Sequence, residues 1–594
     1  MLQRAFLGPL ALAAACSAAG IVTTDFAPLI GPSYLTNFDP TKSETVKDAI
    51  SAFPEVVEKL FSADVINSTD LVFGIDVFSA ATNESLYSYF HVGEGLNKTL
   101  TAGTLNDRTI SRTGSVSKLF TAYAILAKAG FEVFSHPVTR YIPELAGNSS
   151  DDPLENIRWE DITVGALASH QAGTGGAGGL FLSGDFTGFE DVADLEPECK
   201  PDTTLPRHFS ADIFLQVLFQ YMRTKHPVIS PFRNAVYSDG GYSVLGQVLA
   251  RLSGQSYEDA MRDILFEPLG LDDSSVKAPT GSDLNAINRK PVDVNSSWAG
   301  DIPILAGSGG IYSSLADLRT VGLSILNSEL VSPADTQEWM KPLSGTGSLV
   351  SLVGAPWEIA RLMIPVTPNS NRTRVSDLYT KAGGNGDYTC ILALSPDHGI
   401  GYSILVAGST ASSARWPLRD ATGEVFIPAF EHAAVANAEK NLAGTFVAEG
   451  LEGTNLTLTV DEGKPGLGLK SVFIQGNESL PFFLGTPEPL NVTARLYPNG
   501  LNSYSRSLAS LYKTKGKMRV AHRAIVQATP LAPRTAVEGG KGGLFDNSFS
   551  WSNLDFALPL DEFILEIEDG KVVSLTSSAV DFFTEKKVVL KPAN

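Results

Sequence analysis

The pattern of hydrophobic residues changes once along the chain, near Leu442, and this change limits what the chain can fold into. Before Leu442, long apolar stretches suited to helices alternate with shorter strand-like segments. After it, short apolar-rich segments are separated by Gly, Pro and Asn, which is typical of an all-β sandwich or barrel. A chain of 594 residues is also too long for one ordinary hydrophobic core. We therefore expect a mixed α/β (α+β) domain over residues 21–440 and an all-β domain over residues 441–594.

The charge balance excludes several classes of partner. The chain has 45 Lys and Arg against 65 Asp and Glu, a net charge of −20. A nucleic-acid-binding protein presents a basic face, and docking on anionic membranes needs basic residues, so neither partner is expected. No segment after the N-terminus offers about 20 uninterrupted apolar residues for a membrane span. The expected partner is a small-molecule substrate, and the sequence leaves the oligomeric state open.

The N-terminal segment 1–20 has the pattern of a signal peptide. Arg4 is followed by the apolar stretch Ala5 to Ala15 and then by the small residues Ser17, Ala18 and Ala19. The alternative is a buried N-terminal helix. Asn-x-Ser/Thr sites along the chain favour a secreted, glycosylated eukaryotic protein. These sites begin at Asn67, Asn83, Asn97, Asn148, Asn295, Asn371, Asn455, Asn477 and Asn491.

The cysteines do not form a disulfide framework. Cys16 would leave with the signal peptide, so the mature chain keeps Cys199 and Cys390. These two could form one bridge in an oxidising compartment, or they could be two buried thiols. No Cys/His cluster has the spacing of metal ligands. We expect neither a metal ion nor another cofactor.

The local patterns predict most elements of the first domain. Residues 170–210, rich in Gly, Pro and Asp, indicate a long loop or lid. Helices are expected over about 46–61, 117–129, 211–223, 241–253, 256–267, 314–326 and 417–440. Strands are expected over 70–80, 84–92, 387–395 and 399–407.

One Ser-x-x-Lys motif opens a long apolar helix. Lys118 is the third residue after Ser115, so on a helix the two share a face one turn apart. A neighbouring lysine helps to remove the proton from a serine nucleophile. The chain has two other such motifs, Ser274 with Lys277 and Ser510 with Lys513, but neither precedes a core helix. Ser115 is therefore the candidate nucleophile.

Two further motifs follow in order. The first is Tyr237-Ser238-Asp239, and the second is Lys381-Ala382-Gly383-Gly384. With Ser115 and Lys118, this order resembles the serine β-lactamase and penicillin-binding protein superfamily, in particular its class C and esterase-like branch and the secreted fungal β-lactamase-like proteins. The segments Ile162–Gly173 and Gly307–Leu318 resemble two other landmarks of these families. The resemblance covers roughly residues 45–435. Beyond 440 the chain resembles only the small lipocalin-like β domains that some members append.

The resemblance implies a fold and a set of roles. The fold is an antiparallel sheet flanked by helices, with a helical subdomain beside it. Ser115 would be acylated, Lys118 would help to deprotonate it, and Tyr237 would be the general base. Lys381 would supply positive charge, and the backbone N–H groups of Ser115 and Gly384 would form the oxyanion hole. Asp239, Ala382 and Gly383 would contact the substrate.

Two residues depart from the family pattern. Asp239 stands where the family has Asn, and a carboxylate accepts hydrogen bonds but cannot donate them. A carboxylate should also pair with Lys118 and keep it protonated, which leaves Tyr237 as the base. Ala382 stands where the family has Thr or Ser, so a hydroxyl that often holds a substrate carboxylate is missing. Both changes point away from a penicillinase.

These observations predict a secreted serine hydrolase or acyltransferase that acts through an acyl-enzyme on an ester, amide or lactam. The alternatives are a secondary-metabolite tailoring enzyme that uses the same site for other chemistry, and a catalytically silent binding protein. We interpret His170 as a structural histidine rather than a triad base. His398 lies in a tight turn and is expected at the surface.

Overall fold

The computed structural model describes most of the chain. The described residues are 38–147, 152–176, 211–301, 303–368, 370, 372–480, 491–503, 516–529 and 560–593. The predicted signal peptide, Cys199 and most of the predicted lid lie outside these ranges.

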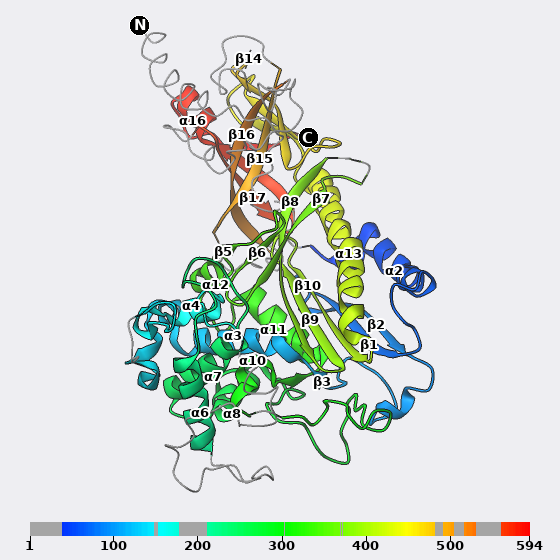
Figure 1. The fold of residues 1–594 in the computed structure, drawn as a ribbon. Coiled ribbons are helices and arrows are strands. Elements are labelled where there is room, and N and C mark those ends of the chain that lie inside the picture. Colours follow the sequence, from blue (N-terminus) through cyan, green and yellow to red (C-terminus); the bar gives the residue numbers. More distant parts are fainter. Residues whose placement is uncertain are drawn as a thin grey trace, which may run out of the picture.

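An antiparallel sheet of eight strands forms the centre of the first domain (Figure 1). Its order is β2-β1-β10-β9-β8-β7-β6-β5, so β2 at the edge pairs with its neighbour β1, while β1 also pairs with β10, the last strand of this domain in the chain. The bounds are β1 Leu71–Ser79, β2 Glu84–Val92, β5 Ser344–Gly345, β6 Ser351–Val353, β7 Glu358–Pro365, β8 Thr373–Asn385, β9 Tyr388–Ser395 and β10 Ile400–Gly408. Every residue of β1, β9 and β10 is buried, because helices cover both faces of these strands. The sheet therefore confirms the expected antiparallel fold.

Helices α2 (Glu44–Ser62) and α13 (Ala411–Asn441) lie together on one face of the sheet (Figure 1). Phe53 of α2 packs on Phe426 of α13, with ring centroids 5.4 Å apart, and both join the core formed with β1 and β10. The other face is covered by α11 (Leu315–Asn327). The apolar faces of these helices thus close the core on both sides of the sheet.

A helical subdomain stands beside the sheet (Figure 1). The expected helix over 117–129 is present as α3 (Ser117–Ala129), which ends at Gly130 in a positive-φ conformation. The expected helix over 256–267 is interrupted, because a π-helical turn at Arg262–Phe266 separates α8 from α9. The remaining helices are α4 Val164–Ala168, α6 Ala211–Thr224, α7 Asp239–Ser253, α8 Tyr257–Met261, α9 Glu267–Leu269, α10 Ala306–Gly309 and α12 Pro333–Trp339.

Short elements complete this domain. A two-stranded sheet joins β3 (Ser111–Arg112) to β4 (Tyr312–Ser313). Single 3₁₀ turns lie at η1 Pro40–Lys42, η2 Asn97–Thr99, η3 Gly114–Val116, η4 Phe131–Ser135, η5 Val138–Arg140, η6 Pro143–Leu145, η7 Trp159–Asp161 and η12 Pro303–Leu305.

The chain after α13 forms a closed β-barrel (Figure 1). Eight strands follow one another around it, and the pairing of β12 with β13 closes the ring, while β14 (Asn477–Glu478) is paired with β13 outside it. The ring consists of β11 Gly444–Ala448, β12 Asn455–Thr459, β13 Leu467–Ile474, β15 Asn491–Asn502, β16 Lys517–Thr529, β17 Glu562–Glu568, β18 Lys571–Ser577 and β19 Leu590–Pro592. Helix α16 (Ser578–Thr584) packs beside β18. Alternate residues of β17 are buried, as a barrel requires. The expected all-β class is confirmed. The domain is a barrel and not a sandwich, because the pairing of β12 with β13 closes the ring of strands.

The barrel contacts the first domain at the loop between β7 and β8. The Thr367 hydroxyl donates to Glu462 Oε1 over 2.8 Å, and the backbone N–H of Gly463 donates to the Thr367 hydroxyl over 3.1 Å. Apolar residues at the C-terminal end of α13, including Ala434 and Ala438, join the buried core that continues into the barrel. The two domains therefore share packed surface.

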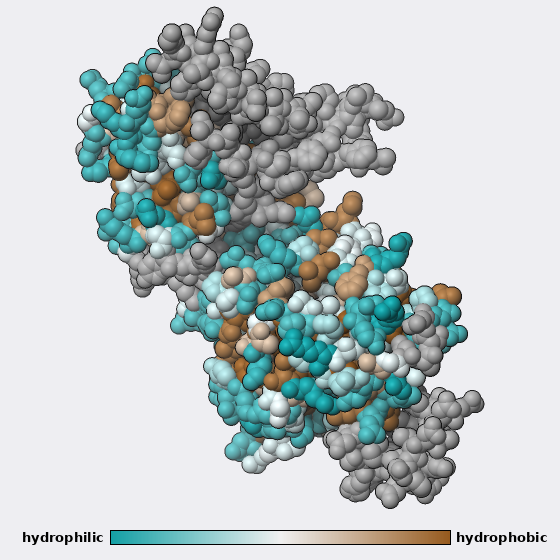
Figure 2. All heavy atoms as spheres, turned by 90° about the vertical axis from the view of Figure 1, so that its left-hand side faces the viewer, coloured by the Kyte–Doolittle hydropathy of each residue, from teal (hydrophilic) through white to brown (hydrophobic). Residues whose placement is uncertain are grey.

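No helix in the described part of the chain is both long enough and apolar enough to cross a bilayer. On the face that Figure 2 shows, apolar residues form patches among hydrophilic ones. Asn67, Asn83, Asn97, Asn295 and Asn477 are exposed, and Asn455 is half-buried. The side chains of the other three predicted glycosylation sites, Asn148, Asn371 and Asn491, lie outside what the structure describes.

Cys390 is fully buried in β9 and carries a free thiol. Burial raises the pKa of this thiol, which makes the reactive thiolate form unfavourable. Cys199 lies outside the described residues, so the state of the two cysteines stays as the sequence left it.

The prediction that His398 lies at the surface is wrong. His398 is 1% exposed, and its Nε2 contacts Glu431 Oε2 at 2.9 Å. Arg374 of β8 makes a two-point ion pair with the same carboxylate, at 2.7 Å for each bond. The Nη1 group of Arg374 donates to Asp397 Oδ2 over 2.9 Å. This polar turn is buried because Glu431 of α13 is the partner of both Arg374 and His398.

The buried cluster of Arg374, His398 and Glu431 predicts a pH-dependent contribution to stability. Burial alone would raise the pKa of Glu431, but Arg374 and His398 hold it at about 2. The carboxylate therefore stabilises the fold above its unfolded pKa, and this stabilisation is lost as the pH falls toward 2. We expect Glu431→Gln to cost about 3–5 kcal/mol at pH 7, because the buried Arg374 guanidinium loses its two-point partner and keeps only the ion pair with Asp397.

Thermal unfolding of wild type and Glu431→Gln from pH 7 to pH 2 measures this effect. The difference between the two proteins should shrink below about pH 4.5. Asp420→Asn is the control, because Asp420 lies on the same helix in an exposed pair with Arg419. Equal unfolding temperatures of wild type and Glu431→Gln at pH 7 would contradict the prediction.

Candidate active site

Ser115 lies at the positive end of α3, in the 3₁₀ turn η3 that leads into the helix. Gly114 begins this turn with a φ of 53°, a conformation that favours glycine. A Cβ atom at Gly114 would also lie 2.5 Å from the backbone nitrogen of Gly384. Glycine at position 114 therefore lets β8 approach the nucleophile from the opposite side.

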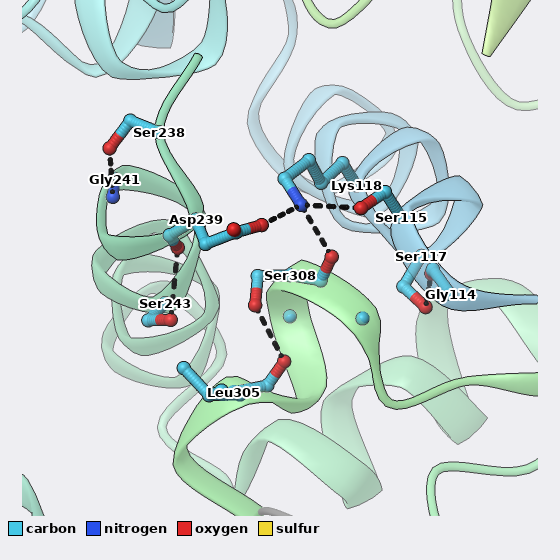
Figure 3. Close-up of polar contacts among 12 residues, drawn as sticks. Gly114, Ser115, Ser117, Lys118, Ser238, Asp239, Gly241, Ser243, Leu305 and Ser308 are labelled. Atoms are coloured by element: carbon cyan, nitrogen blue, oxygen red, sulfur yellow. Dashed lines mark hydrogen bonds and ion pairs between the residues drawn. The ribbon is translucent and has the colours of Figure 1, made fainter. Parts of the chain in front are cut away.

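The Lys118 ammonium is buried and fully bonded (Figure 3). Its Nζ donates to Ser115 Oγ over 3.1 Å, to Asp239 Oδ1 over 2.6 Å and to the carbonyl oxygen of Ser308 over 2.6 Å. An ammonium has three donors, and these three acceptors use all of them. The expected pairing of Asp239 with Lys118 is thus present. In this arrangement Lys118 acts as a charged donor to the Ser115 hydroxyl.

Tyr237 lies between the two lysines of the site. The Nζ atoms of Lys118 and Lys381 are 4.9 Å and 5.3 Å from the centroid of its ring. Burial raises the pKa of Tyr237, but the ammonium groups of Lys381 and Lys118 together outweigh burial, so the pKa lies below its ordinary value. The side chain remains 45% exposed. A phenol with a lowered pKa and access to solvent can act as a general base.

The cap of α7 fixes the position of Tyr237. Ser238 is the N-cap of this helix, and its hydroxyl accepts from the N–H of Gly241 over 2.8 Å. The N–H of Ser238 donates to His170 Nδ1 over 3.2 Å, and the rings of His170 and Tyr237 are 4.6 Å apart. Burial and the two lysines lower the pKa of His170 well below its ordinary value, so the ring is neutral. His170 therefore contacts Tyr237, the predicted base, and positions the backbone beside it.

The strand β8 passes very close to the nucleophile. A Cβ atom at Gly383 would lie 2.0 Å from the Thr113 carbonyl oxygen and 2.7 Å from the Ser115 nitrogen. Arg415 of α13 donates to the Gly383 carbonyl over 3.1 Å. The backbone nitrogens of Ser115 and Gly384, the two predicted oxyanion donors, are thereby brought to one place.

Glu358 belongs to the site, although the sequence did not indicate it. It lies on β7 opposite Thr380 of β8. Its Oε1 accepts from Lys381 Nζ over 2.5 Å, and its Oε2 accepts from the N–H of Ala382 over 3.0 Å. Lys381 also donates to the Ala382 carbonyl over 2.6 Å. No local pattern could identify Glu358, because its place depends on the register between β7 and β8.

The structure places the remaining candidates elsewhere. The Ser274 hydroxyl donates to Asp317 over 2.7 Å in a structural contact, and Ser510 lies outside the described residues. Among the described residues, no group of His, Cys, Asp and Glu is arranged to hold a metal ion.

Comparisons with known proteins show the family of the chain. The family model described as "Beta-lactamase" matches residues 83–423, more than half of the chain. A model described as "Beta-lactamase-like-like, C-terminal domain" matches residues 434–587. The chain therefore belongs to the beta-lactamase family and carries the C-terminal domain of its beta-lactamase-like members.

Two curated relatives are fungal proteins. The "Beta-lactamase-like protein" of Arthroderma benhamiae is 26% identical over 585 residues, which cover 90% of this chain and 91% of that protein. The "Probable hydrolase clz13" of Cochliobolus lunatus is 26% identical over 470 residues, which cover 73% of this chain and 72% of that protein. The chain is thus similar to both over most of their length.

The contact between Gly383 and η3 makes a first prediction for the site. Gly383→Ala should slow the labelling of Ser115 by a fluorophosphonate probe about 100-fold, because a displacement of about 1 Å at a reacting group can cost that much. Gly347→Ala is the control, since no heavy atom lies within 4 Å of a Cβ there. Labelling of Gly383→Ala within threefold of the wild-type rate would show that β8 does not constrain the nucleophile.

Proposed function

We propose that the protein is a serine hydrolase that forms an acyl-enzyme on Ser115. The observation that carries the proposal is the contact of Lys118 Nζ with Ser115 Oγ, together with the position of Tyr237 beside both lysines. The name of the Cochliobolus lunatus relative, which is called a probable hydrolase, supports it.

The proposed mechanism uses groups of this chain alone. Tyr237 accepts the proton of Ser115 Oγ, and the oxygen attacks the carbonyl carbon of the substrate. The N–H groups of Ser115 and Gly384 stabilise the oxyanion. Tyr237 then donates the proton to the leaving group. A water molecule, deprotonated by Tyr237, then attacks the acyl carbon. Tyr237 returns this proton to Ser115 Oγ as the ester bond breaks, which releases the carboxylic acid and restores the site. Lys118 orients Ser115 throughout and is paired with Asp239.

We further propose that the protein is secreted and N-glycosylated. The proposal rests on the N-terminal segment 1–20 and on the exposure of five of the predicted asparagines. Transfer of the acyl group to an acceptor other than water uses the same intermediate. No contact of the described residues favours transfer over hydrolysis.

The nucleophile is tested by Ser115→Ala. We expect this variant to lose covalent labelling by a fluorophosphonate and to lose at least about 10³-fold in ester turnover, because the acyl-enzyme cannot form. Intact-protein mass spectrometry and p-nitrophenyl ester hydrolysis measure the two effects. The matched control is Ser274→Ala, which removes the serine of another Ser-x-x-Lys motif. Turnover by Ser115→Ala at the wild-type rate would refute the proposed nucleophile.

The role of Tyr237 as base predicts an effect of Asp239. Asp239 raises the pKa of Tyr237, although the lysines outweigh it. Asp239→Asn should therefore move the acidic limb of the kcat/KM profile to lower pH, by about half a pH unit or more. Measurement of ester hydrolysis from pH 5 to pH 9 checks this.

The control for Asp239→Asn is Asp259→Asn. Its carboxylate has a similar exposure, 46% against 47%, and also pairs with a cation. An acidic limb that stays in place in Asp239→Asn would argue against Tyr237 as the titrating base.

A further inference from the structure

Phe232 is a large aromatic residue held in a backbone conformation that favours glycine. Its φ is 61°, in the left-handed region, which is unfavourable for a bulky side chain. Phe232 is also 53% exposed, so burial of its ring offsets only part of this cost. Strained residues of this kind gather at active sites and at segments that hold ligands. The strain and the exposure together indicate that the ring serves something other than the stability of the fold.

The loop that carries Phe232 leads to Tyr237, the predicted base. The N–H of Phe232 donates to the carbonyl oxygen of Gln171 over 2.8 Å, and the N–H of Val236 donates to that of His170 over 2.8 Å. The ring of His170 lies 4.6 Å from the ring of Tyr237. Two hydrogen bonds therefore fix the loop to the segment that contacts the base.

The β5–β6 hairpin borders the same loop. The N–H of Ala235 donates to the Ser344 hydroxyl of β5 over 3.3 Å. Leu343, directly before Ser344, is 43% exposed. Val353 of the hairpin pairs with Glu358, which contacts the buried lysine of β8. The hairpin thus brings a second exposed apolar side chain to the border of the site.

Phe232 and Leu343 form what we call the apolar rim. They lie on the two segments that meet between Ala235 and Ser344, and Tyr237 follows Ala235 by two residues. Tyr237 is itself 45% exposed, so a substrate can approach the base from this side. The removal of apolar surface from water favours binding in proportion to the area covered. The occupant that suits the rim is an apolar chain of a substrate whose ester group is at Ser115.

We propose that Phe232 is a specificity-determining residue that binds an apolar chain of the substrate. The site then prefers esters with a longer apolar chain over short ones. The strained backbone at Phe232 keeps the ring in place for this contact. This inference rests on the proposed acyl-enzyme function of Ser115.

Two pairs of esters test the inference on the full-length protein. The first pair is p-nitrophenyl acetate and p-nitrophenyl hexanoate, which differ in the acyl chain. The second pair is ethyl acetate and hexyl acetate, which differ in the alcohol chain and are followed by titration of the released acid. Wild type should prefer the longer ester of at least one pair by about tenfold in kcat/KM, which is about 1.4 kcal/mol. The pair that shows the preference tells which side of the ester the rim binds.

Phe232→Gly should remove most of this preference. The ratio of long to short ester turnover should fall about tenfold, while kcat/KM for the short ester stays within about threefold of wild type. Glycine is favoured at a φ of 61°, so this variant keeps the fold of the loop. Phe232→Leu keeps an apolar side chain and should retain the preference.

Glu585→Gly is the matched control for the release of backbone strain. Glu585 also has a left-handed backbone, with a φ of 55°, but it ends helix α16 of the barrel domain. Its substitution should leave both ratios at the wild-type value.

Several results would overturn the inference. One is a ratio in Phe232→Gly within about threefold of wild type in both pairs, and another is an equal loss for the long and the short ester. A wild-type protein without preference for the longer ester of either pair also overturns it, and that measurement does not depend on the folding of any variant. Loss of all turnover in Ser115→Ala, with unchanged ratios in Phe232→Gly, would refute the role of Phe232 but leave the proposed hydrolase intact.

Discussion

The burial of the Lys118 ammonium is the interaction on which the candidate site depends. Removal of an ammonium from water costs several kcal/mol, and only a complete set of acceptors offsets that cost. The acceptors come from the turn before α3, from the first turn of α7 and from α10. These elements must therefore pack in one arrangement, which also sets the position of the Ser115 hydroxyl. The same lysine lies over the ring of Tyr237, so the group that orders the site also tunes the base.

The second lysine of the site is also buried and paired with a carboxylate. Lys381 is buried on β8, and Glu358 of β7 balances its charge. The carboxylates remove the net charge of the site, yet they do not cancel the effect of the lysines on the phenol, because the pKa of Tyr237 still lies below its ordinary value.

The sheet and helix α13 hold these groups in place from outside the site. Strand β8 carries Lys381 and the glycines that touch the nucleophile, and it begins at Thr373, next to the buried pair of Arg374 with Glu431. That pair joins β8 to α13, and Arg415 of α13 contacts the Gly383 carbonyl at the other end of the strand. The helix thus fixes the strand at two points, one near the barrel domain and one beside the nucleophile.

The sequence by itself determined many of the elements, although not strands β5 to β8, and the local pairs. Helix α3 is set by its own apolar residues and by Gly130, and the spacing of Ser115 and Lys118 places both on one turn of backbone. The periodicity of apolar residues predicted a mixed first domain and an all-β second domain, because side-chain periodicity follows from the backbone geometry of helices and strands. The order of the motifs showed the family resemblance. Only this resemblance indicated which distant residues meet at the site.

The tertiary structure alone decided the contacts between distant segments. Glu358 reaches Lys381 because of the register of β7 and β8, and no periodicity within either strand encodes that register. His398 is buried because Glu431 arrives from another element, so its polar turn could not reveal the burial. The barrel closes through the pairing of β12 with β13, which short apolar segments in a sequence allow but do not require. In each case the deciding interaction joins residues from different elements. It can stabilise the fold only after the segments between these residues have packed.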